Sequence, residues 1–597
     1  MIIRDKNQYQ EAVEKLLTYD LVALDSETQE FDDEHTHVFE LDLDGLGLST
    51  GDYSVYIPKK FLDASFQKII DKCEIVFHNA KFDLTILEKE GYDISKIRFH
   101  DTMIMAWLLD ENRLSFGLKQ LANSVLKVKK EAIKEFRSIQ KRPLHADYGS
   151  SLFPELYEED KKTWEEELGK YCIKDCQYTI KLFHKFKPKL EEKGLTKVYE
   201  ELEIPTVLVL RDMENRGIRI DLEYMAKIKA KMESKLIELQ SNLYRLVGYN
   251  FDINSPKQLV DILFTVGKGK GYNLPMEFRT AKGGLSTNVF ALKYLMEKYK
   301  CPISKALLEH REMYKLYSAY AIGLTKKQKN GLIHTSFMQH GTVTGRFSSK
   351  SPNLQQLPRR DDELNIREAF LPREGYCFVI SDLSQIELRL AAHFSQDPVL
   401  VNAYANNKDI HQETADILGV DRNISKQVNF GLLYGRTAFG MAKGLGMSPE
   451  EAQKFIDNYF KKFHNLYIFM EQAKNTLRQN YQVKTLLGRF RRFPEYVKAK
   501  KDRDQKTMGR MERQAINSVV QGSAADIIKV QMRNLARRLK EYDAHLLVQV
   551  HDEVIIECPI SKAEEVEKIV KFEMENAVKL NGVPIITEPQ IANRWKK

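Results

Sequence analysis

The first third of the chain alternates short apolar runs with segments of helical periodicity. Three runs have the length and the apolar character of strands, namely DLVALDSE (20–27), YSVYIP (53–58) and CEIVFHN (73–79). Between and after them, FLDASFQKIIDK (61–72) and LTILEKEG (84–91) carry the spacing of amphipathic helices. Because alternating strands and helices pack as layers, the pattern predicts an α/β domain over about residues 1–190.

The pattern changes after Leu190. Residues 195–330 are dominated by long, charged amphipathic helices such as the segment 222–247, with no strands of note, and the Gly-rich stretch 267–275 predicts a loop. Strands return from residue 331 onward, in YCFVISD (376–382) and HLLVQVHDEVIIEC (545–558). They flank helices between about 401 and 530, which predicts a mixed sheet with a helical insertion.

Composition limits the class of protein. The 597 residues exceed a single core and predict about three to five domains. No run approaches eighteen apolar residues and the N-terminus lacks a signal pattern, so we expect no membrane partner and a cytoplasmic location. The six cysteines are scattered, as is typical of a reducing compartment, with zinc held by Cys172, Cys176 and His184 as the alternative. The net charge of +8 permits a polyanion partner, although local basic clusters also suit a solvated helix face.

Four acidic residues and a tyrosine form a first candidate site. Asp25 and Glu27 close an apolar strand, and their i, i+2 spacing places both carboxylates on one face. Asp83 follows at the start of a helix, and Tyr171 and Asp175 stand four apart on one helical face. Taken singly, the first pair suits a strand end at the surface and Asp83 suits a helix cap.

Converging carboxylates repel one another unless cations compensate them, and Mg²⁺ prefers such oxygen ligands. Two Mg²⁺ ions would activate a water and stabilise the leaving oxygen in phosphodiester cleavage, with Tyr171 orienting the water. Residues 20–190 resemble the 3′→5′ exonuclease domain of the DEDD superfamily, tyrosine subtype. The resemblance implies an RNase-H-like fold and an intact proofreading site.

A second candidate site lies in the C-terminal half. FVISDLSQIELRLAAHF predicts a strand that ends at Asp382 and a helix after it. LLVQVHDEVIIE predicts a hairpin that carries His551, Asp552 and Glu553, and a tight turn alone would also explain that acidic pair. Together, Asp382 and Asp552 would form a platform for two Mg²⁺ ions that activate a primer 3′-hydroxyl and neutralise a triphosphate.

A four-residue period marks a third segment. Arg422, Lys426, Phe430 and Tyr434 form one stripe on a predicted helix, in the order cation, cation, aromatic, aromatic. This order suits a nucleotide with its triphosphate at the basic end and its base on Phe430. An amphipathic helix with both aromatic rings in the core is the alternative.

These three segments resemble motifs A, B and C of the family A, or DNA polymerase I-like, enzymes. INSPKQL (253–259), TVTGRFSSKSPNLQQLP (342–358), DIHQETA (409–415) and ERQAINSVVQGSAADIIK (512–529) match further motifs. The resemblance implies a right-hand polymerase domain over 191–597, with thumb about 195–335, palm about 336–400 and 530–597, and fingers about 401–529. The fold class is thus α/β and α+β multidomain, an RNase-H-like exonuclease domain followed by this polymerase domain.

The same resemblance implies roles for individual residues. Asp382 and Asp552 bind metal with Glu553 close by, and Glu387, hydrogen-bonded to Tyr434, blocks a ribose 2′-hydroxyl. Residues near the incoming nucleotide are Arg422, Lys426, Phe430, Tyr434, His411, Gln385 and Glu387. Residues that hold the primer–template are Arg346, Asn353, Gln355, Arg513, Asn517, Gln521 and His551, some of them through minor-groove acceptors common to all base pairs.

Some features depart from the family pattern. Leu383 stands where the family usually has Tyr, which should be tolerated because the backbone carbonyl is used there, and no 5′ nuclease domain is expected. We expect a monomer that uses primer–template DNA, dNTPs and two Mg²⁺ ions per site, with Mn²⁺ able to substitute, in a bacterial, phage-infected or organellar setting. The rivals are an RNase D-like exonuclease with a helical extension, a single-subunit RNA polymerase and a non-catalytic clamp. None of them explains Asp382, Asp552 and Glu387 together.

Overall fold

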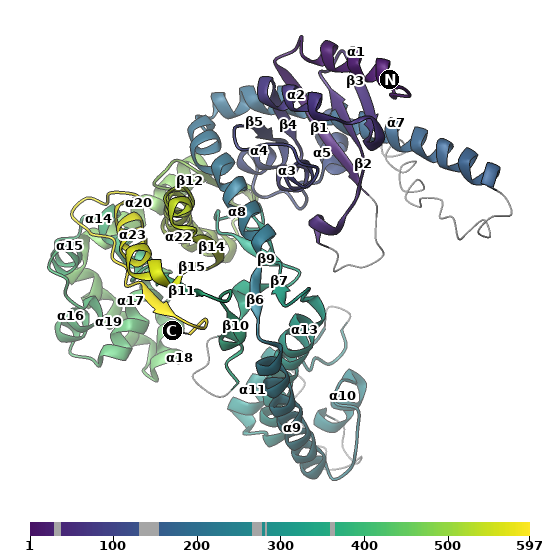
Figure 1. The fold of residues 1–597 in the computed structure, drawn as a ribbon. Coiled ribbons are helices and arrows are strands. Elements are labelled where there is room, and N and C mark those ends of the chain that lie inside the picture. The colour runs from purple at the N-terminus through teal and green to yellow at the C-terminus, as the bar shows by residue number, and fades with distance from the viewer. Residues whose placement is uncertain (29–36, 130–153, 265–277, 281–282, 359–363, 597) are drawn as a thin grey trace. The chain divides into compact units, whose positions relative to one another are not determined.

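The structure, a computed structural model, describes residues 1–28, 37–129, 154–264, 278–280, 283–358 and 364–596. The chain forms two structural units (Figure 1). The first unit contains Met1–Arg216, Ser336–Lys350 and Val379–Ile591. The second unit contains Gly217–Thr335, Ser351–Phe378 and Ala592–Lys597.

The N-terminal part of the first unit is built on a five-stranded sheet of order β3-β2-β1-β4-β5. β1 (Leu21–Thr28), β2 (Leu43–Ser49) and β3 (Ser54–Pro58) are antiparallel, while β4 (Glu74–Phe77) and β5 (Arg98–Asp101) run parallel to β1. The three predicted strands are therefore confirmed. The accompanying helices are α1 (Lys6–Leu16), α2 (Gln67–Lys72), α3 (Ala80–Lys89), α4 (Thr102–Leu109), α5 (Leu118–Leu126) and α7 (Pro154–Glu192).

The C-terminal part of the first unit surrounds a sheet of order β14-β15-β11-β16. Its strands are β14 (His545–Val550), β15 (Glu553–Pro559), β11 (Tyr376–Asp382) and β16 (Gln590–Ala592), so the predicted strand and hairpin are confirmed. The helical insertion is also confirmed. Its helices and those that flank it are α14 (Ile386–Ser395), α15 (Pro398–Ala405), α16 (Ile410–Leu418), α17 (Arg422–Leu433), α18 (Ala438–Leu445), α19 (Pro449–Lys462), α20 (His464–Asn480), α21 (Pro494–Lys501), α22 (Gln505–Arg538) and α23 (Ala563–Asn576).

A helical connection and two small hairpins complete the first unit. The π-helix η6 (Val198–Glu203) and α8 (Ile204–Arg216) follow α7, and their buried residues place them inside the unit. Two small hairpins pair β8 (Ser336–Met338) with β9 (Ser348–Lys350) and β12 (Gln482–Lys484) with β13 (Phe490–Arg492). The second hairpin lies where only helices were predicted, because three-residue strands are too short to show a period.

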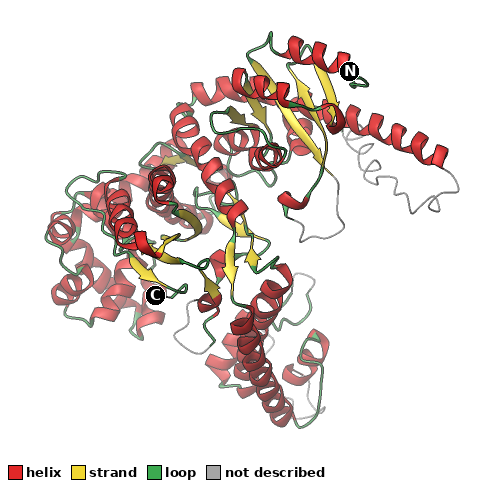
Figure 2. Ribbon diagram, viewed as in Figure 1, coloured by secondary structure: helices red, strands yellow, loops and turns green. Residues whose placement is uncertain are grey.

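The second unit is mostly helical (Figure 2). α9 (Leu222–Val247) packs on α12 (Pro302–Leu316), next to α10 (Pro256–Phe264), α11 (Val289–Tyr299) and α13 (Gly323–Lys327). The expectation of no notable strands was incomplete, because β6 (Ile218–Ile220) pairs with β10 (Phe370–Leu371) and β7 (Leu332–Ile333). These partners are distant in sequence, so local pattern could not reveal the strand. The predicted loop 267–275 lies outside the described residues.

The helices were compared with the length and apolar character of a membrane span. Within the described ranges, none combines the length and apolar character needed to cross a bilayer. The long helices α9 and α22 are charged along much of their length.

Candidate active sites

Asp25 and Glu27 lie on β1, in register with Gly47 and Gly45 of β2. These glycines are required by packing, because a Cβ on Gly47 would come within 2.5 Å of the Cys172 sulfur on α7. The bare backbone of β2 therefore lets α7 lie close against the strands that carry the two carboxylates. The close approach explains how the distant segment around Cys172 reaches the same site.

Asp83 turns toward the same strand. Both the backbone N–H and the hydroxyl of Ser26 donate to Asp83 Oδ1, at 2.9 and 2.6 Å. The N-cap of α3 is Asn79, in the left-handed conformation at φ 76°. Ser26, between the two acidic residues of β1, thus locks Asp83 to them, and the helix-cap interpretation is not what the geometry favours.

Asp175 and Tyr171 come from α7, and a residue that the sequence analysis did not single out joins them. The ammonium of Lys119, on α5, donates to Asp175 Oδ1 and lies 4.1 Å from the centre of the Tyr171 ring. Tyr171 is also hydrogen-bonded to Asp175. A lone lysine in a stretch without any other motif gave no signal from which this contact could have been inferred.

The electrostatics of this carboxylate cluster (Asp25, Glu27, Asp83 and Asp175) favour a bound cation. Burial, and then the charges of their neighbours, raise the pKa of Asp25 well above its ordinary value and that of Glu27 to about 8. Burial also raises the pKa of Asp83 to about 7, and that of Asp175. Ligand atoms of Asp25, Glu27 and Cys172 lie within 4.8 Å of one another. The two carboxylates of this group, which repel each other and are partly open to solvent, suit a hard divalent ion, whereas the Cys172 thiol does not. Asp83 and Asp175 lie outside this group of ligand atoms.

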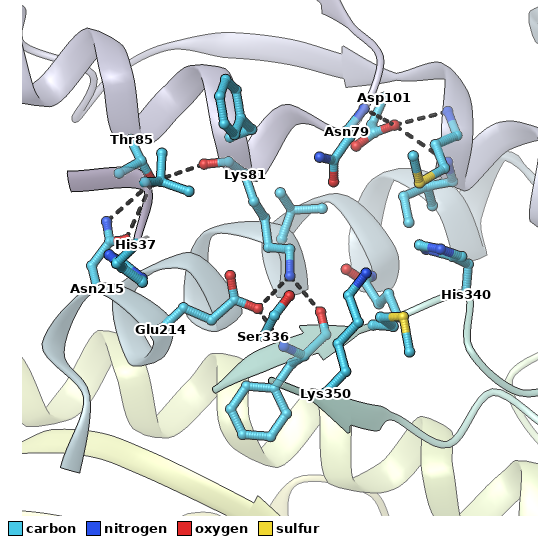
Figure 3. A pocket seen from close by; sticks show the side chains of 18 residues that line it. His37, Asn79, Lys81, Thr85, Asp101, Glu214, Asn215, Ser336, His340 and Lys350 are labelled. Carbon is cyan, nitrogen blue, oxygen red and sulfur yellow. Dashed lines mark hydrogen bonds and ion pairs between the residues drawn. The ribbon is translucent and has the colours of Figure 1, made fainter. Parts of the chain in front are cut away.

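A cavity of about 270 Å³ lies between the start of α3 and the β8–β9 hairpin (Figure 3). It is lined at one end by Asn79 and Phe82, at the start of the helix that carries Asp83, and at the other by β8, β9 and the loop between them. Lys81 crosses it to reach Glu214 at 2.5 Å and the Phe337 carbonyl. Burial, together with the charges of Lys81 and Lys350, lowers the pKa of His340 to about 4. The cavity thus borders the first turn of α3, where Phe82 precedes Asp83, and its lining includes Lys350 and the Lys81–Glu214 pair.

Asp382 and Asp552 lie at neighbouring strand ends of the second sheet. Asp382 ends β11, and Asp552 stands in the two-residue turn between β14 and β15. The Leu383 N–H donates to the Asp552 carbonyl at 3.1 Å, which ties the two segments together. Burial raises the pKa of Asp552 to about 6, and the charges of Glu387 and Asp382 add to the rise. Leu383 is buried and makes this link through its backbone, and the tolerance of its side chain stays a prediction.

The other turn residues are placed differently. His551 is exposed and holds a left-handed backbone at φ 56° without being a glycine, a conformation that costs free energy and recurs at functional sites. Glu553, the first residue of β15, is only 1% exposed. The hairpin thus directs Asp552 toward Asp382 and buries Glu553 beneath it in the sheet.

Glu387 occupies the centre of a small network next to Asp552. Its two carboxylate oxygens accept hydrogen bonds from Arg346 and from the Tyr434 hydroxyl, so the predicted bond to Tyr434 is present. Burial raises the pKa of Glu387, and the nearby Arg346 opposes that rise. Gln385 lies just before α14 and accepts a 3.0 Å hydrogen bond from Tyr404. The network fixes a buried carboxylate at one border of the site.

The stripe on α17 faces away from the core. The buried residues of this helix are Ser425, Val428, Asn429, Leu432 and Leu433. On the opposite face, Arg422 and Lys426 are exposed while Phe430 and Tyr434 are half-buried and stacked at 6.3 Å. The alternative of two core aromatic rings is therefore not favoured.

Further contacts extend the stripe. The His411 ring lies 5.7 Å from that of Phe430, and burial lowers the pKa of His411. Arg422 pairs with Asp409 at 2.7 Å, an exposed ion pair of little energetic weight. The basic end of the stripe is therefore held near the start of α16, which carries His411.

The predicted DNA-binding residues fall into separate groups. Arg513, Asn517 and Gln521 share one face of α22, and a Cβ on Gly435 would lie 2.5 Å from Arg513 Cγ. The buried side-chain oxygen of Asn517 has no hydrogen-bond partner among the described residues. Asn353 and Gln355 belong to the second unit, where Asn353 caps a short 3₁₀ helix through the Gln355 N–H. Their contacts with DNA stay predictions.

Comparison with known proteins decides the family. The sequence profile of DNA polymerase family A matches residues 222–597, and a 3′-5′ exonuclease profile matches residues 1–191. The chain belongs to DNA polymerase family A. The resemblance inferred from the motifs is confirmed, and so is the fold class of an exonuclease domain followed by a family A polymerase domain. Domains of both kinds generally use divalent metal ions.

Curated relatives agree. The chain is 33% identical to DNA polymerase I of Borreliella burgdorferi over 99% of its own length and 64% of that protein. It is 34% identical to DNA polymerase I of Caldicellulosiruptor bescii over 90% of its length and 58% of that protein. The chain spans about half to two thirds of the length of these family A relatives.

A solved structure covers the whole chain. The POL domain of Pol1 from M. smegmatis, in complex with DNA primer-template and dNTP, is similar with a TM-score of 0.83 and 26% identity. The similarity covers 100% of this chain and 99% of that one. Both halves of this family A chain thus have counterparts in one known polymerase domain.

Proposed function

We propose that this chain extends a DNA primer on a template with dNTPs and removes nucleotides from the 3′ end in a second, separate site. The observation that carries the proposal is the presence of two carboxylate sites in one family A chain. One is built from β1, α3 and α7, and the other from the ends of β11 and the β14–β15 hairpin. The activity would serve DNA replication, repair or both.

In the synthetic site, Asp382 and Asp552 would hold two Mg²⁺ ions, for which Mn²⁺ could substitute. Such ions lower the pKa of a primer 3′-hydroxyl and neutralise charge on a triphosphate. The α17 stripe supports this arrangement, because it presents Arg422 and Lys426 for phosphates and Phe430 for a base. Glu387, buried and held by Arg346 and Tyr434, would exclude the 2′-hydroxyl of a ribonucleotide.

In the nuclease site, the carboxylate cluster would hold the ions and Tyr171 would orient the attacking water. The cavity at the start of α3 supports a route for the frayed primer strand, because its lining includes Lys350 and Phe82, the residue before Asp83. A single strand that leaves the synthetic site could therefore reach the cluster past the Lys350 ammonium. We propose that the chain acts as a monomer on primer–template DNA.

Replacement of one carboxylate tests the separation of the two sites. Asp552→Asn should reduce primer extension by more than about 10³-fold, because the ions lose a ligand, and should leave digestion of a single-stranded 3′ end at the wild-type rate. Asp543→Asn, at the other end of the same hairpin in an exposed turn, is the matched control and should preserve both activities. Joint loss of both activities in a folded Asp552→Asn protein would contradict the two-site proposal.

Sugar selection can be measured independently. Glu387→Ala should raise the efficiency of rNTP incorporation relative to dNTP by about 10-fold or more, because a steric barrier is lost. Glu413→Ala, a partly exposed glutamate on α16 that pairs with Lys408, serves as the control. Unchanged dNTP/rNTP discrimination in Glu387→Ala would reject the steric role.

A further inference from the structure

Lys119 is an unexpected cation within the nuclease site. It is the second residue of α5, which begins at Leu118 and has no side-chain N-cap bond. A cation at a helix N-terminus is disfavoured by the helix dipole, typically by about 0.3–1 kcal/mol. Something outside the helix must therefore hold Lys119 there, and the structure identifies it as Asp175.

Two contacts define its position. The Lys119 ammonium donates to Asp175 Oδ1 and lies 4.1 Å above the Tyr171 ring. The Lys119 side chain is 22% exposed and that of Asp175 8%, so the pair is shielded from most of the solvent. One ammonium thus touches both residues that α7 contributes to the nuclease site.

The charge of Lys119 extends beyond Asp175. It lowers the pKa of Glu27 as well, against the larger effects of burial and of Asp175. Four carboxylates in one pocket repel one another, and Lys119 supplies part of the positive charge that a divalent ion would supply in full.

We propose that Lys119 is a positioning residue of the nuclease site, whose ammonium substitutes for a metal ion on Asp175 and keeps Tyr171 in place. The proposal rests on the nuclease function proposed above. A divalent ion must compete with Lys119 for Asp175 Oδ1. Loss of the ammonium therefore frees the carboxylate for the ion, and it also frees the Tyr171 ring to rotate.

The variants Lys119→Met, Lys119→Gln and Lys119→Arg separate these effects. Lys185→Met is the matched control, because Lys185 also joins α7 to α5, through the Val125 carbonyl at 3.0 Å and away from the carboxylates. All are made in the full chain with Asp552→Asn, so that Mn²⁺ binding reports mainly on the nuclease site. Binding is measured by calorimetry, and digestion of a single-stranded 3′ end is measured at saturating Mn²⁺.

We expect Lys119→Met and Lys119→Gln to bind Mn²⁺ roughly 3-fold or more tightly, as expected when a competing unit charge is removed from a partly screened pocket. Their kcat for digestion should fall about 10-fold, because the cation over Tyr171 is lost. Lys119→Arg should restore kcat to within about 2-fold and, like Lys185→Met, should bind Mn²⁺ as the parent does.

The two measurements test the two proposals separately. Mn²⁺ affinity equal to that of Lys185→Met in both neutral variants would overturn the proposal, and so would weaker binding. If the parent chain shows no digestion at all, the nuclease function proposed above fails, while the binding comparison still decides the part played by Lys119.

Discussion

Two clusters of buried charge in the first unit behave in opposite ways. The carboxylate cluster gathers like charges, and its pKa values are raised. An ion cluster elsewhere, formed by Glu203, Asp526, Arg489 and Lys529, gathers opposite charges. Burial alone would raise the pKa of Glu203, but Arg489 and Lys529 outweigh it and lower that pKa to about 2.

The four side chains of the ion cluster contact one another and are buried from solvent. Arg489 Nη2 lies 2.7 Å from Asp526 and also contacts Glu203, and Lys529 Nζ lies 2.8 Å from Glu203. The side chains of all four are at most 4% exposed. Burial lowers the pKa of Lys529 to about 8 even so, which leaves Arg489 as the stronger partner of Glu203.

The opposite pKa changes in the two clusters show that burial alone does not identify a binding site. In the carboxylate cluster a raised pKa accompanies like charges that a cation would stabilise, whereas the lowered pKa of Glu203 accompanies a closed set of ion pairs. Both clusters are buried. The sign of the pKa change and the access to solvent therefore separate the candidate ion-binding cluster from the cluster of structural ion pairs.

The largest expected effect comes from the carboxylate cluster. Asp25→Ala with Glu27→Ala should reduce 3′ digestion by more than about 10³-fold, because the ions lose ligands, and should leave primer extension unchanged. The melting temperature without metal should not fall, since two repelling charges are removed. Retention of full digestion would show that the site is misassigned, and strong destabilisation would break the comparison.

The ion cluster should respond in the opposite way. Glu203→Gln leaves Arg489 and Lys529 short of a counter-charge and should destabilise the fold by about 3–5 kcal/mol, measured by denaturant unfolding. Glu201→Gln is the matched control, since the Glu201 side chain on the same π-helix is 65% exposed. If the two variants have equal free energies of unfolding, the ion cluster does not stabilise the fold.

The smallest effect is a pH dependence. Because the folded-state pKa of Glu203 is lowered to about 2, its stabilisation is fully present above its ordinary value of 4.5 and is lost as pH falls toward 2. The gap in melting temperature between the wild type and Glu203→Gln should therefore be constant above about pH 5 and narrow below it. If the gap in melting temperature widens as pH falls, the pKa of Glu203 is not lowered in the folded state.

Much of the site followed from local sequence pattern. The i, i+2 spacing of Asp25 and Glu27 and the apolar runs around Asp382 and Asp552 are properties of single elements, and periodicity predicts those well. Lys119, Ser26 and the ion cluster were not predicted, because their contacts join residues from different elements. Glu203 and Lys529 are 326 residues apart, and no local pattern links them. The strand β6 was missed for the same reason, and β12 and β13 were missed because three residues are too few to show a period.

The indole of Trp107 on α4 donates to the Thr342 carbonyl at 3.2 Å, within the loop that leads to Arg346. The same ring lies 4.9 Å from the Arg489 guanidinium. A helix of the exonuclease domain therefore supports the loop that leads to Arg346, one of the predicted DNA-binding residues. Deletion of the exonuclease domain would remove this support from the loop, so the proposed nuclease activity is better tested by point substitution, which keeps the Trp107 contact.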